Sequence, residues 1–198
     1  MLAVLLAVGS AFHPVADGGY KVGDKAMDFK LKNVDGRMVS LADDQAAKGY
    51  ILVFTCNHCP YSQAYEQRII ALHQKYAPLG YPVVAINPND PQVSPEDSFP
   101  EMQKRAKEKQ YPFAYLFDET QAIARTYGAT RTPHVYVLTR TGADLRVAYI
   151  GAIDNDTENP EKASERYVEK AMTEVMAGKP VSSSFTKAVG CTIKWRKS

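Results

Sequence analysis

A strand–helix–strand pattern near the middle of the sequence constrains the fold more than any other feature. Residues 50–55 form a continuous apolar run, which is typical of a strand buried on both faces of a sheet. Residues 83–86 form a second such run. Between the two runs, apolar residues recur at spacings of four, three and four, as on one face of a helix: Tyr65, Ile69, Leu72 and Tyr76. The pattern predicts a right-handed βαβ unit with parallel strands, and therefore an α/β fold.

Turn residues and alternating apolar and polar residues on both sides of this unit predict further strands and helices. Together they predict a central mixed β-sheet flanked by helices. Before the βαβ unit, two alternating segments around Asp35-Gly36 predict an N-terminal β-hairpin. After it, residues 88–100 hold four prolines, so we expect a Pro-rich surface insertion without regular strands. The remaining predicted elements are a helix at 101–110, a strand at 113–117, a helix between Asp118 and Gly128, a hairpin formed by 135–138 and 146–150, and a helix from Asn159 to Gly178.

Length and charge limit the class of protein. The chain has 198 residues and no internal repeat, so we expect one domain that spans residues 20–198, including a C-terminal tail. Lys and Arg number 24 against 22 Asp and Glu, which leaves a net charge of +2. This charge is too small to indicate a nucleic-acid partner.

The first residues are predicted to be a leader. Residues 2–8 are apolar, but the run is far shorter than the ~20 residues that a membrane-spanning helix needs, so we expect no transmembrane protein. Small residues at 9–11 follow, as at a signal-peptidase site. Residues 1–19 are therefore predicted to be a signal peptide or flexible leader, and the protein to be exported to the periplasm. The alternatives are a short N-terminal element that packs on the domain and a cytoplasmic location.

Two of the three cysteines form a motif that can carry redox chemistry. Cys56-Asn57-His58-Cys59 lies where the first buried strand passes into the helix. Unpaired N–H groups and the positive end of the helix dipole stabilise a thiolate there, and a two-residue spacer allows a disulfide. We expect Cys56 to be the exposed nucleophile with a pKa below the ~8.5 of a free cysteine, and Cys59 to resolve the mixed disulfide. A cationic His58 would favour the Cys56 thiolate further.

Other interpretations of these residues remain open at the sequence level. A zinc site would need two more ligands, and Cys191 together with the available histidines shows no paired spacing. Two inert buried cysteines are a second alternative. Together with Cys56 and Cys59, His134 would form a soft Cu(I) site. Cys191 is predicted mainly to pack in the core beside Ile193, with a resolving or regulatory thiol as the alternative. No metal or cofactor is expected for the favoured function.

Four blocks of the sequence resemble the peroxiredoxin-like group of the thioredoxin fold, related to the alkyl hydroperoxide reductase/thiol-specific antioxidant (AhpC/TSA) superfamily. The resemblance covers nearly the whole chain from Tyr20 onward. It is carried by residues 21–29 with Asp35-Gly36, residues 54–61 around the cysteine motif, residues 127–134, and residues 190–195. The resemblance implies a thioredoxin-like fold and thiol redox activity.

The resemblance also implies a substrate groove. In the thioredoxin fold a cis proline faces the dithiol, and Thr132-Pro133 matches it. Pro133 would then shape the groove and the Thr132 backbone would pair with a bound chain, with Asn57 in the same groove. Arg131 lies near the position at which a peroxiredoxin arginine polarises peroxide. The sequence departs from peroxiredoxins three residues before Cys59, where Cys56 stands in place of their threonine.

The sequence thus predicts a thiol–disulfide oxidoreductase that uses a Cys56–Cys59 redox pair through a mixed-disulfide intermediate. Its partners would be protein or small-molecule thiols and disulfides. A thiol-dependent peroxidase is the enzymatic alternative, and a Cu(I)-binding protein of the same fold is the non-enzymatic one. The sequence fixes neither the redox partner nor the oligomeric state.

Overall fold

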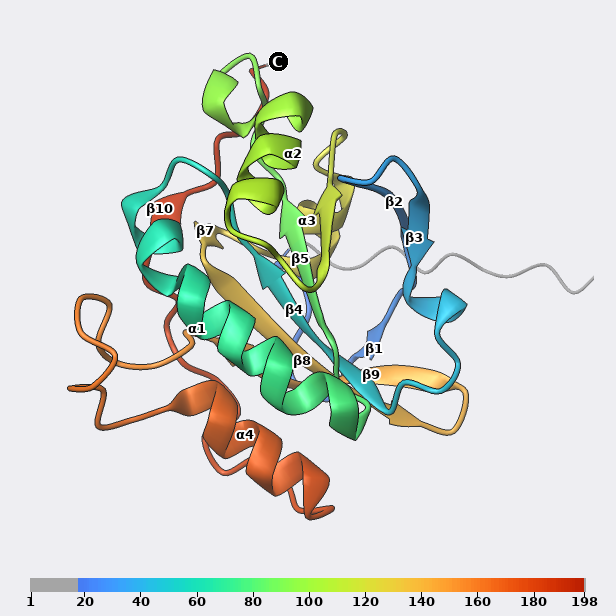
Figure 1. The fold of residues 1–198 in the computed structure, drawn as a ribbon. Helices are drawn as coiled ribbons and strands as arrows, with labels where there is room; N and C mark the ends of the chain where they lie inside the picture. Colours follow the sequence, from blue (N-terminus) through green and yellow to red (C-terminus); the bar gives the residue numbers. More distant parts are fainter. Residues whose placement is uncertain (1–17, 198) are drawn as a thin grey trace, which may run out of the picture.

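The structure is a computed structural model that describes residues 18–197 (Figure 1). The predicted leader lies outside the described residues up to position 17. Eight strands form one sheet in the order β1-β9-β8-β4-β5-β6-β2-β3, and β10 pairs with β7 separately. The strands are β1 (Lys25–Ala26), β2 (Lys30–Asn33), β3 (Met38–Ser40), β4 (Gly49–Phe54), β5 (Val83–Asn87), β6 (Ala114–Phe117), β7 (Arg131–Thr132), β8 (His134–Thr141), β9 (Asp144–Gly151) and β10 (Cys191–Thr192).

The predicted βαβ unit is confirmed. Strands β4 and β5 pair in parallel, with Ile51 opposite Val83, and α1 (Pro60–Tyr76) connects them. The two predicted hairpins are also confirmed, because β2 pairs antiparallel with β3 and β8 pairs antiparallel with β9. The sheet is therefore mixed, with β4 at its centre between parallel β5 and antiparallel β8.

Helices cover both faces of the sheet. Helices α1, α2 (Phe99–Glu108) and α4 (Tyr167–Met176) lie on one face, and α3 (Ala122–Tyr127) lies on the other (Figure 1). Alternate residues of β4 serve the two cores: Ile51 and Val53 pack on the α1 side, whereas Leu52 and Phe54 pack on the α3 side. Burial on both faces explains why this strand is apolar throughout.

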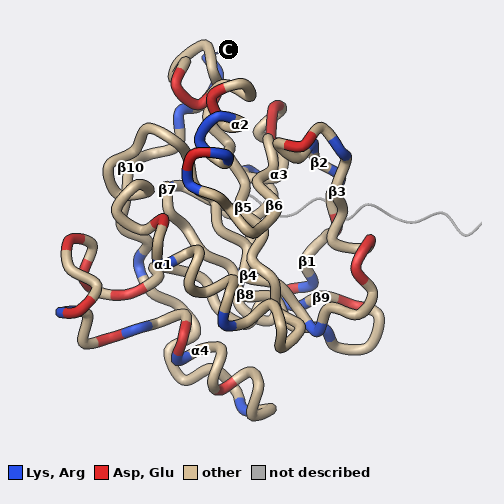
Figure 2. The backbone as a smooth tube through the Cα atoms, viewed as in Figure 1, with Lys and Arg blue, Asp and Glu red and all other residues tan. Residues whose placement is uncertain are grey.

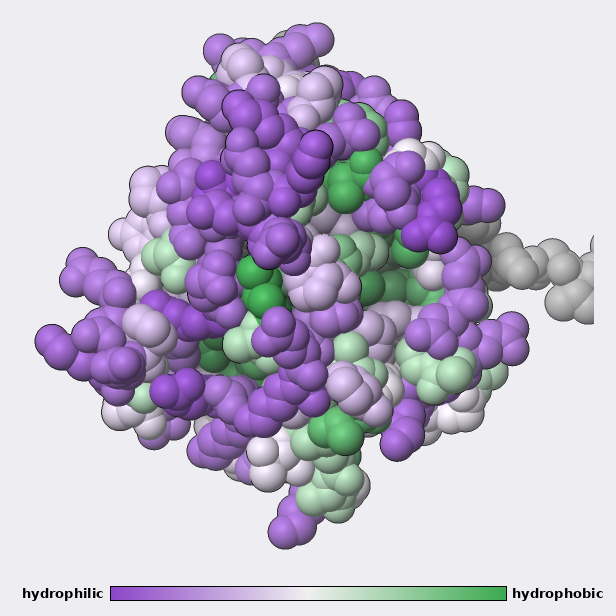
Figure 3. Space-filling view, viewed as in Figure 1, coloured by the Kyte–Doolittle hydropathy of each residue, from purple (hydrophilic) through white to green (hydrophobic). Residues whose placement is uncertain are grey.

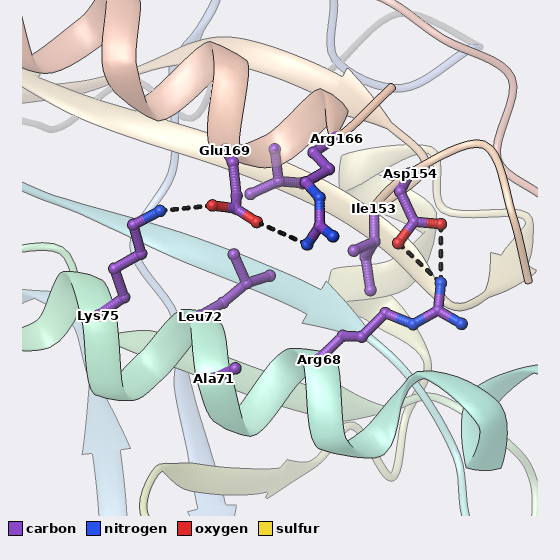
Figure 4. A pocket seen from close by; sticks show the side chains of 9 residues that line it. Arg68, Ala71, Leu72, Lys75, Ile153, Asp154, Arg166 and Glu169 are labelled. Atoms are coloured by element: carbon purple, nitrogen blue, oxygen red, sulfur yellow. Dashed lines mark hydrogen bonds and ion pairs between the residues drawn. The ribbon is translucent and has the colours of Figure 1, made fainter. Parts of the chain in front are cut away.

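An ion-pair cluster joins α1 to α4 and to the loop before it (Figure 4). The Arg68 Nη1 atom donates to both carboxylate oxygens of Asp154, at 2.8 and 2.7 Å. Lys75 and Arg166 both pair with Glu169 of α4. The Arg68–Asp154 pair is nearly buried, whereas the pairs with Glu169 are largely exposed. The buried pair is thus the one that fixes the loop after β9 to α1.

Two predicted features differ from the structure in their details. The Pro-rich segment 88–100 contains no strand, as predicted, and much of it is exposed, but Asn89, Asp90, Ser94 and Asp97 within it are buried. The side chains of Asn89 and Ser94 bond to Asp97, which also accepts from the cysteine loop, and these bonds compensate for burying polar groups. The last helix begins at Tyr167 and not at Asn159, whose side chain instead accepts from the Glu161 N–H in a turn.

Figure 2 shows where the charged residues lie along the described part of the chain. Basic and acidic residues alternate along the outer helices and loops, while the central strands carry almost none (Figure 2). The face that carries α1, α2 and α4 is mostly hydrophilic, with small apolar patches (Figure 3). Among the described residues, no helix has the length and apolar character that crossing a membrane requires.

Candidate active site

The cysteine motif lies at the end of β4, where the chain turns into α1. Cys59 is the N-cap residue of α1 and Pro60 is its first residue. Proline suits this position, because its missing N–H would have no partner within the helix and its φ angle is already helical. Cys59 is therefore the cysteine at the positive end of a 17-residue helix, and Cys56 lies one loop earlier.

The disulfide in the structure joins Cys59 to Cys191, and Cys56 is free. The bond connects residues 132 positions apart, with their Cα atoms 6.1 Å from each other. This state differs from the predicted Cys56–Cys59 pairing. The prediction that Cys191 mainly packs in the core is wrong. Its position agrees with the alternative prediction, in which the C-terminal tail folds back and brings Cys191 to the cysteine motif.

Cys56 is not the exposed, acidic thiol that the sequence predicts. It is 4% exposed, and its sulfur lies 3.2 Å from Thr132 Oγ1 and 3.7 Å from Ser62 Oγ. Burial raises the pKa of Cys56, and the nearby Asp97 carboxylate raises it further, against smaller opposing effects of the hydrogen bonds. This environment favours the protonated thiol of Cys56 over the thiolate.

Asp97 is a buried carboxylate that sequence reasoning missed. It accepts hydrogen bonds from the Asn57 N–H at 2.6 Å, from Ser94 Oγ at 2.7 Å and from Asn89 Nδ2 at 2.8 Å. It comes from the Pro-rich segment and not from β4, whose residues Gly49–Phe54 include no acidic side chain. The only sequence signal was the acidic character of that segment, which equally suits a solvated loop.

We expect Asp97→Asn to lower the pKa of Cys56. The substitution removes the negative charge that opposes thiolate formation and keeps an oxygen that can accept the Asn57 N–H. The measurement is the thiolate absorbance at 240 nm against pH, in a Cys59→Ser/Cys191→Ser background that leaves Cys56 as the only cysteine. Glu96→Gln, at an exposed neighbouring carboxylate, is the matched control. An unchanged titration in Asp97→Asn would contradict the electrostatic explanation.

The structure places the Asn57 side chain inside the protein and His58 at the surface. The Asn57 side chain faces inward: its Oδ1 accepts from Tyr115 Oη at 2.9 Å and its Nδ2 donates to the Glu96 carbonyl at 2.8 Å. These bonds hold the cysteine loop to β6 and to the Pro-rich segment. His58 is exposed, and its Nδ1 lies 3.5 Å from Ser94 Oγ.

The Thr132-Pro133 peptide bond is cis, as predicted. Thr132 contacts both sulfurs of the motif, through Oγ1 to Cys56 and through its carbonyl oxygen, which lies 3.3 Å from Cys59 Sγ. Its strand, β7, pairs antiparallel with β10, so that Cys191 lies opposite Thr132. Arg131 donates from Nη1 to the Gly190 carbonyl at 3.3 Å. This part of the site therefore holds the C-terminal tail (Figure 1).

The structure does not bring the predicted Cu(I) ligands together. Within residues 18–197, no group of three His, Cys, Asp or Glu side chains is placed to hold a metal ion. His134 lies on β8 with its ring 4.9 Å from that of Tyr136, and its Nδ1 accepts from the Thr130 N–H at 3.4 Å. Burial lowers the pKa of His134 to about 4. The predicted site of Cys56, Cys59 and His134 is therefore not formed, and Cys59 is bonded elsewhere.

The family model described as "AhpC/TSA family" matches residues 22–155. No curated protein matches the chain. An uncharacterized conserved protein from Geobacillus kaustophilus is 37% identical with a TM-score of 0.82, and the match covers 90% of this chain and 94% of that one. A hypothetical protein from Sinorhizobium meliloti 1021 is 30% identical with a TM-score of 0.83, covering 91% and 97%.

A more distant structure, described as a proposed thiol:disulfide interchange protein DsbE from Chlorobium tepidum, has a TM-score of 0.59 at 23% identity. The match covers 77% of this chain and 96% of that chain. At this identity the similarity concerns the fold alone, and it confirms the predicted thioredoxin-like α/β fold.

Proposed function

The chain belongs to the AhpC/TSA family, and from that premise we propose that it is a thiol–disulfide oxidoreductase in which Cys56 and Cys59 form the redox pair. Its substrates are thiols and disulfides of proteins or small molecules. The name of the DsbE-like structure, a thiol:disulfide interchange protein, is consistent with this reaction.

One observation carries the proposal: Cys59, at the start of α1, holds the sulfur of a distant segment in a disulfide while a free thiol lies three residues before it. A mixed disulfide with a substrate requires the same arrangement, with the substrate sulfur in the place of Cys191 Sγ. The free Cys56 is then the group that resolves it. This reverses the order of the two cysteines that the sequence predicts.

The reaction involves four sulfurs, those of Cys56 and Cys59 and the two of the substrate disulfide. In the reduced protein, the Cys59 thiolate, favoured by the helix dipole, attacks a substrate disulfide; an S–S bond forms at Cys59 and one substrate thiolate leaves and takes up a proton. Cys56 then loses its proton to water and attacks Cys59 Sγ, releasing the second substrate thiol. The substrate gains two electrons and the protein is left with a Cys56–Cys59 disulfide, which an external dithiol reduces. The oxidising direction is the same sequence in reverse.

The test is catalysed exchange by the wild-type chain. We expect micromolar protein to accelerate the reduction of a polypeptide disulfide by dithiothreitol above the rate with dithiothreitol alone. Mass spectrometry of alkylated samples across a series of glutathione redox buffers should then detect both a Cys59–Cys191 and a Cys56–Cys59 disulfide. Absence of any acceleration would contradict the proposed function.

A peroxidase is the second candidate, favoured by the family and by the Cys59–Cys191 bond. The Cys59 thiolate would attack a peroxide, forming a sulfenic acid and an alcohol or water, and the Cys191 thiol would condense with it, releasing water. The product is the disulfide of the structure. Peroxide consumption that depends on a thiol reductant and on Cys191 would support this candidate, and absence of consumption at micromolar peroxide would remove it.

A further inference from the structure

The C-terminal tail occupies the site as a polypeptide substrate would. The tail strand β10 pairs antiparallel with β7, directly before the cis Pro133, and presents Cys191 to Cys59. Addition of a strand supplies main-chain hydrogen bonds, and the pockets for alternate side chains supply selectivity. The residues on either side of Cys191 therefore indicate which side chains the site beside β7 can bind.

The position before Cys191 accepts only glycine. A Cβ atom added to Gly190 would lie 2.2 Å from the Thr132 carbonyl oxygen and 3.1 Å from the Pro133 nitrogen, both of which are main-chain atoms. These atoms belong to the segment around the cis peptide bond and cannot move away as a flexible side chain would. A larger residue at this position would prevent the tail from pairing with β7.

The position two after Cys191 accepts an apolar side chain. Ile193 is 3% exposed and belongs to the core on the α3 side of the sheet, and its N–H donates to the Thr130 carbonyl at 3.3 Å. The intervening Thr192 is exposed. This alternation is that of an extended strand whose residues 191 and 193 face inward.

The tail also closes the site. Cys59 is 1% exposed and Cys56 is 4% exposed, so that neither sulfur can meet a sulfur of another molecule while β10 is in place. Residues outside this strand fix the tail on both sides: Thr186 Oγ1 accepts from the Ala152 N–H at 3.0 Å, and the Lys194 N–H donates to Asn89 Oδ1 at 2.9 Å. The segment between these anchors, residues 187–193, is the part that must lift.

We propose that residues 187–193 are an in-chain substrate, and that the sites of Gly190 and Ile193 select polypeptide partners with glycine before the reacting cysteine and an apolar residue two positions after it. The inference rests on the proposed function and specifies its substrate class. The segment competes with such partners for β7.

Release of the segment needs no external electrons. The Cys56 thiol loses its proton and its sulfur attacks Cys59 Sγ; the Cys59–Cys191 bond breaks as the Cys56–Cys59 bond forms, and the Cys191 thiolate takes up a proton. One disulfide is exchanged for another. Thr132 contacts both Cys56 and Cys59, which holds the two sulfurs at the same edge of β7.

The test uses four peptides with the sequence of residues 188–195 and its variants, each with its cysteine bonded to thionitrobenzoate. The peptides are the parent, one with valine for glycine before the cysteine, one with aspartate for isoleucine after it, and a control with glutamate for the exposed threonine. The measurement is the release of thionitrobenzoate by the reduced full-length Cys191→Ala protein, divided by the rate of each peptide with dithiothreitol.

We expect the parent and the glutamate control to react at similar rates, and the other two peptides to react at least about tenfold more slowly. The aspartate peptide loses the burial of one large apolar side chain, which is worth about that much. The valine peptide brings its Cβ atom against the main chain of Thr132 and Pro133. Equal rates for all four peptides would overturn the inference and leave the proposed function intact. If the protein reacts with every peptide no faster than dithiothreitol does, the result would instead contradict the proposed function.

A second measurement tests the competition within the chain. In a Cys191→Ala background, Gly190→Val should lift residues 187–193 and increase the rate with the parent peptide severalfold, whereas Ala177→Val adds bulk at an exposed position outside this segment and should change the rate little. An unchanged or lower rate in a folded Gly190→Val variant would show that the segment does not compete, and would overturn the inference. Circular dichroism establishes that each variant is folded.

Discussion

Cys56→Ser should accumulate a covalent complex between the protein and a polypeptide disulfide substrate, with turnover reduced to the uncatalysed rate. The variant keeps Cys59, which forms the mixed disulfide, and lacks the thiol that resolves it. Serine also keeps a polar group of similar size beside Thr132 Oγ1. The measurement is non-reducing electrophoresis and mass spectrometry of the complex, together with steady-state turnover. A Cys191→Ala background prevents the tail from resolving the complex in place of Cys56.

The matched variant is Cys59→Ser in the same background, which should form no complex and show no turnover. Cys191→Ala alone should keep both the mixed disulfide and its resolution, because Cys56 remains. A complex that accumulates in Cys59→Ser and not in Cys56→Ser would restore the order predicted from the sequence, with Cys56 as the attacking thiol. A wild-type level of turnover in both serine variants would contradict the redox pair altogether.

Asp154→Ala should destabilise the protein by about 3–5 kcal/mol, the cost of leaving one member of a buried ion pair without its partner. The side chains of Arg68 and Asp154 are 12% and 5% exposed, and Tyr65 Oη also donates to Asp154 at 2.9 Å. Arg68 bonds in addition to the Thr157 carbonyl, at 2.8 Å. The substitution thus removes the carboxylate partner of both the Arg68 guanidinium and the Tyr65 hydroxyl. Urea unfolding of the oxidised protein, followed by circular dichroism, measures the loss.

The control is Lys75→Met, which removes the largely exposed pair between α1 and Glu169 of α4 and should change stability by less than about 1 kcal/mol. A double variant, Arg68→Met/Asp154→Leu, should recover part of the loss, because two apolar side chains leave no unpaired charge. Equal losses for Asp154→Ala and Lys75→Met would contradict the role assigned to the buried pair.

Local patterns predicted the elements on which the site is built. The apolar run at 50–55 and the helical spacing from Tyr65 to Tyr76 correspond to β4 and α1. The position of Cys59 at the helix start and the cis peptide bond before Pro133 follow from the same segments and from the family resemblance. These features depend on residues close together in the sequence, where periodicity and turn chemistry act directly.

Predictions about the site failed where they needed contacts between distant residues. Much of the Pro-rich segment is exposed, as its sequence predicts, but its Asp97 is fully buried because Asn57, Asn89 and Ser94 together satisfy its carboxylate. The high pKa of Cys56 follows from that burial and that charge, whereas the sequence indicated only the helix dipole, which favours a thiolate.

Apolar periodicity and helix-start residues act locally, and from them alone the chain is predicted to form a βαβ unit with a Cys-x-x-Cys motif at its strand-to-helix junction. Which sulfurs form the disulfide depends instead on the folded domain. Cys191 reaches Cys59 because α4 and the tail return the chain to β7, where one short strand pairing brings together residues 132 positions apart. No local pattern encodes a pairing of that kind, since it depends on the packing of the whole domain.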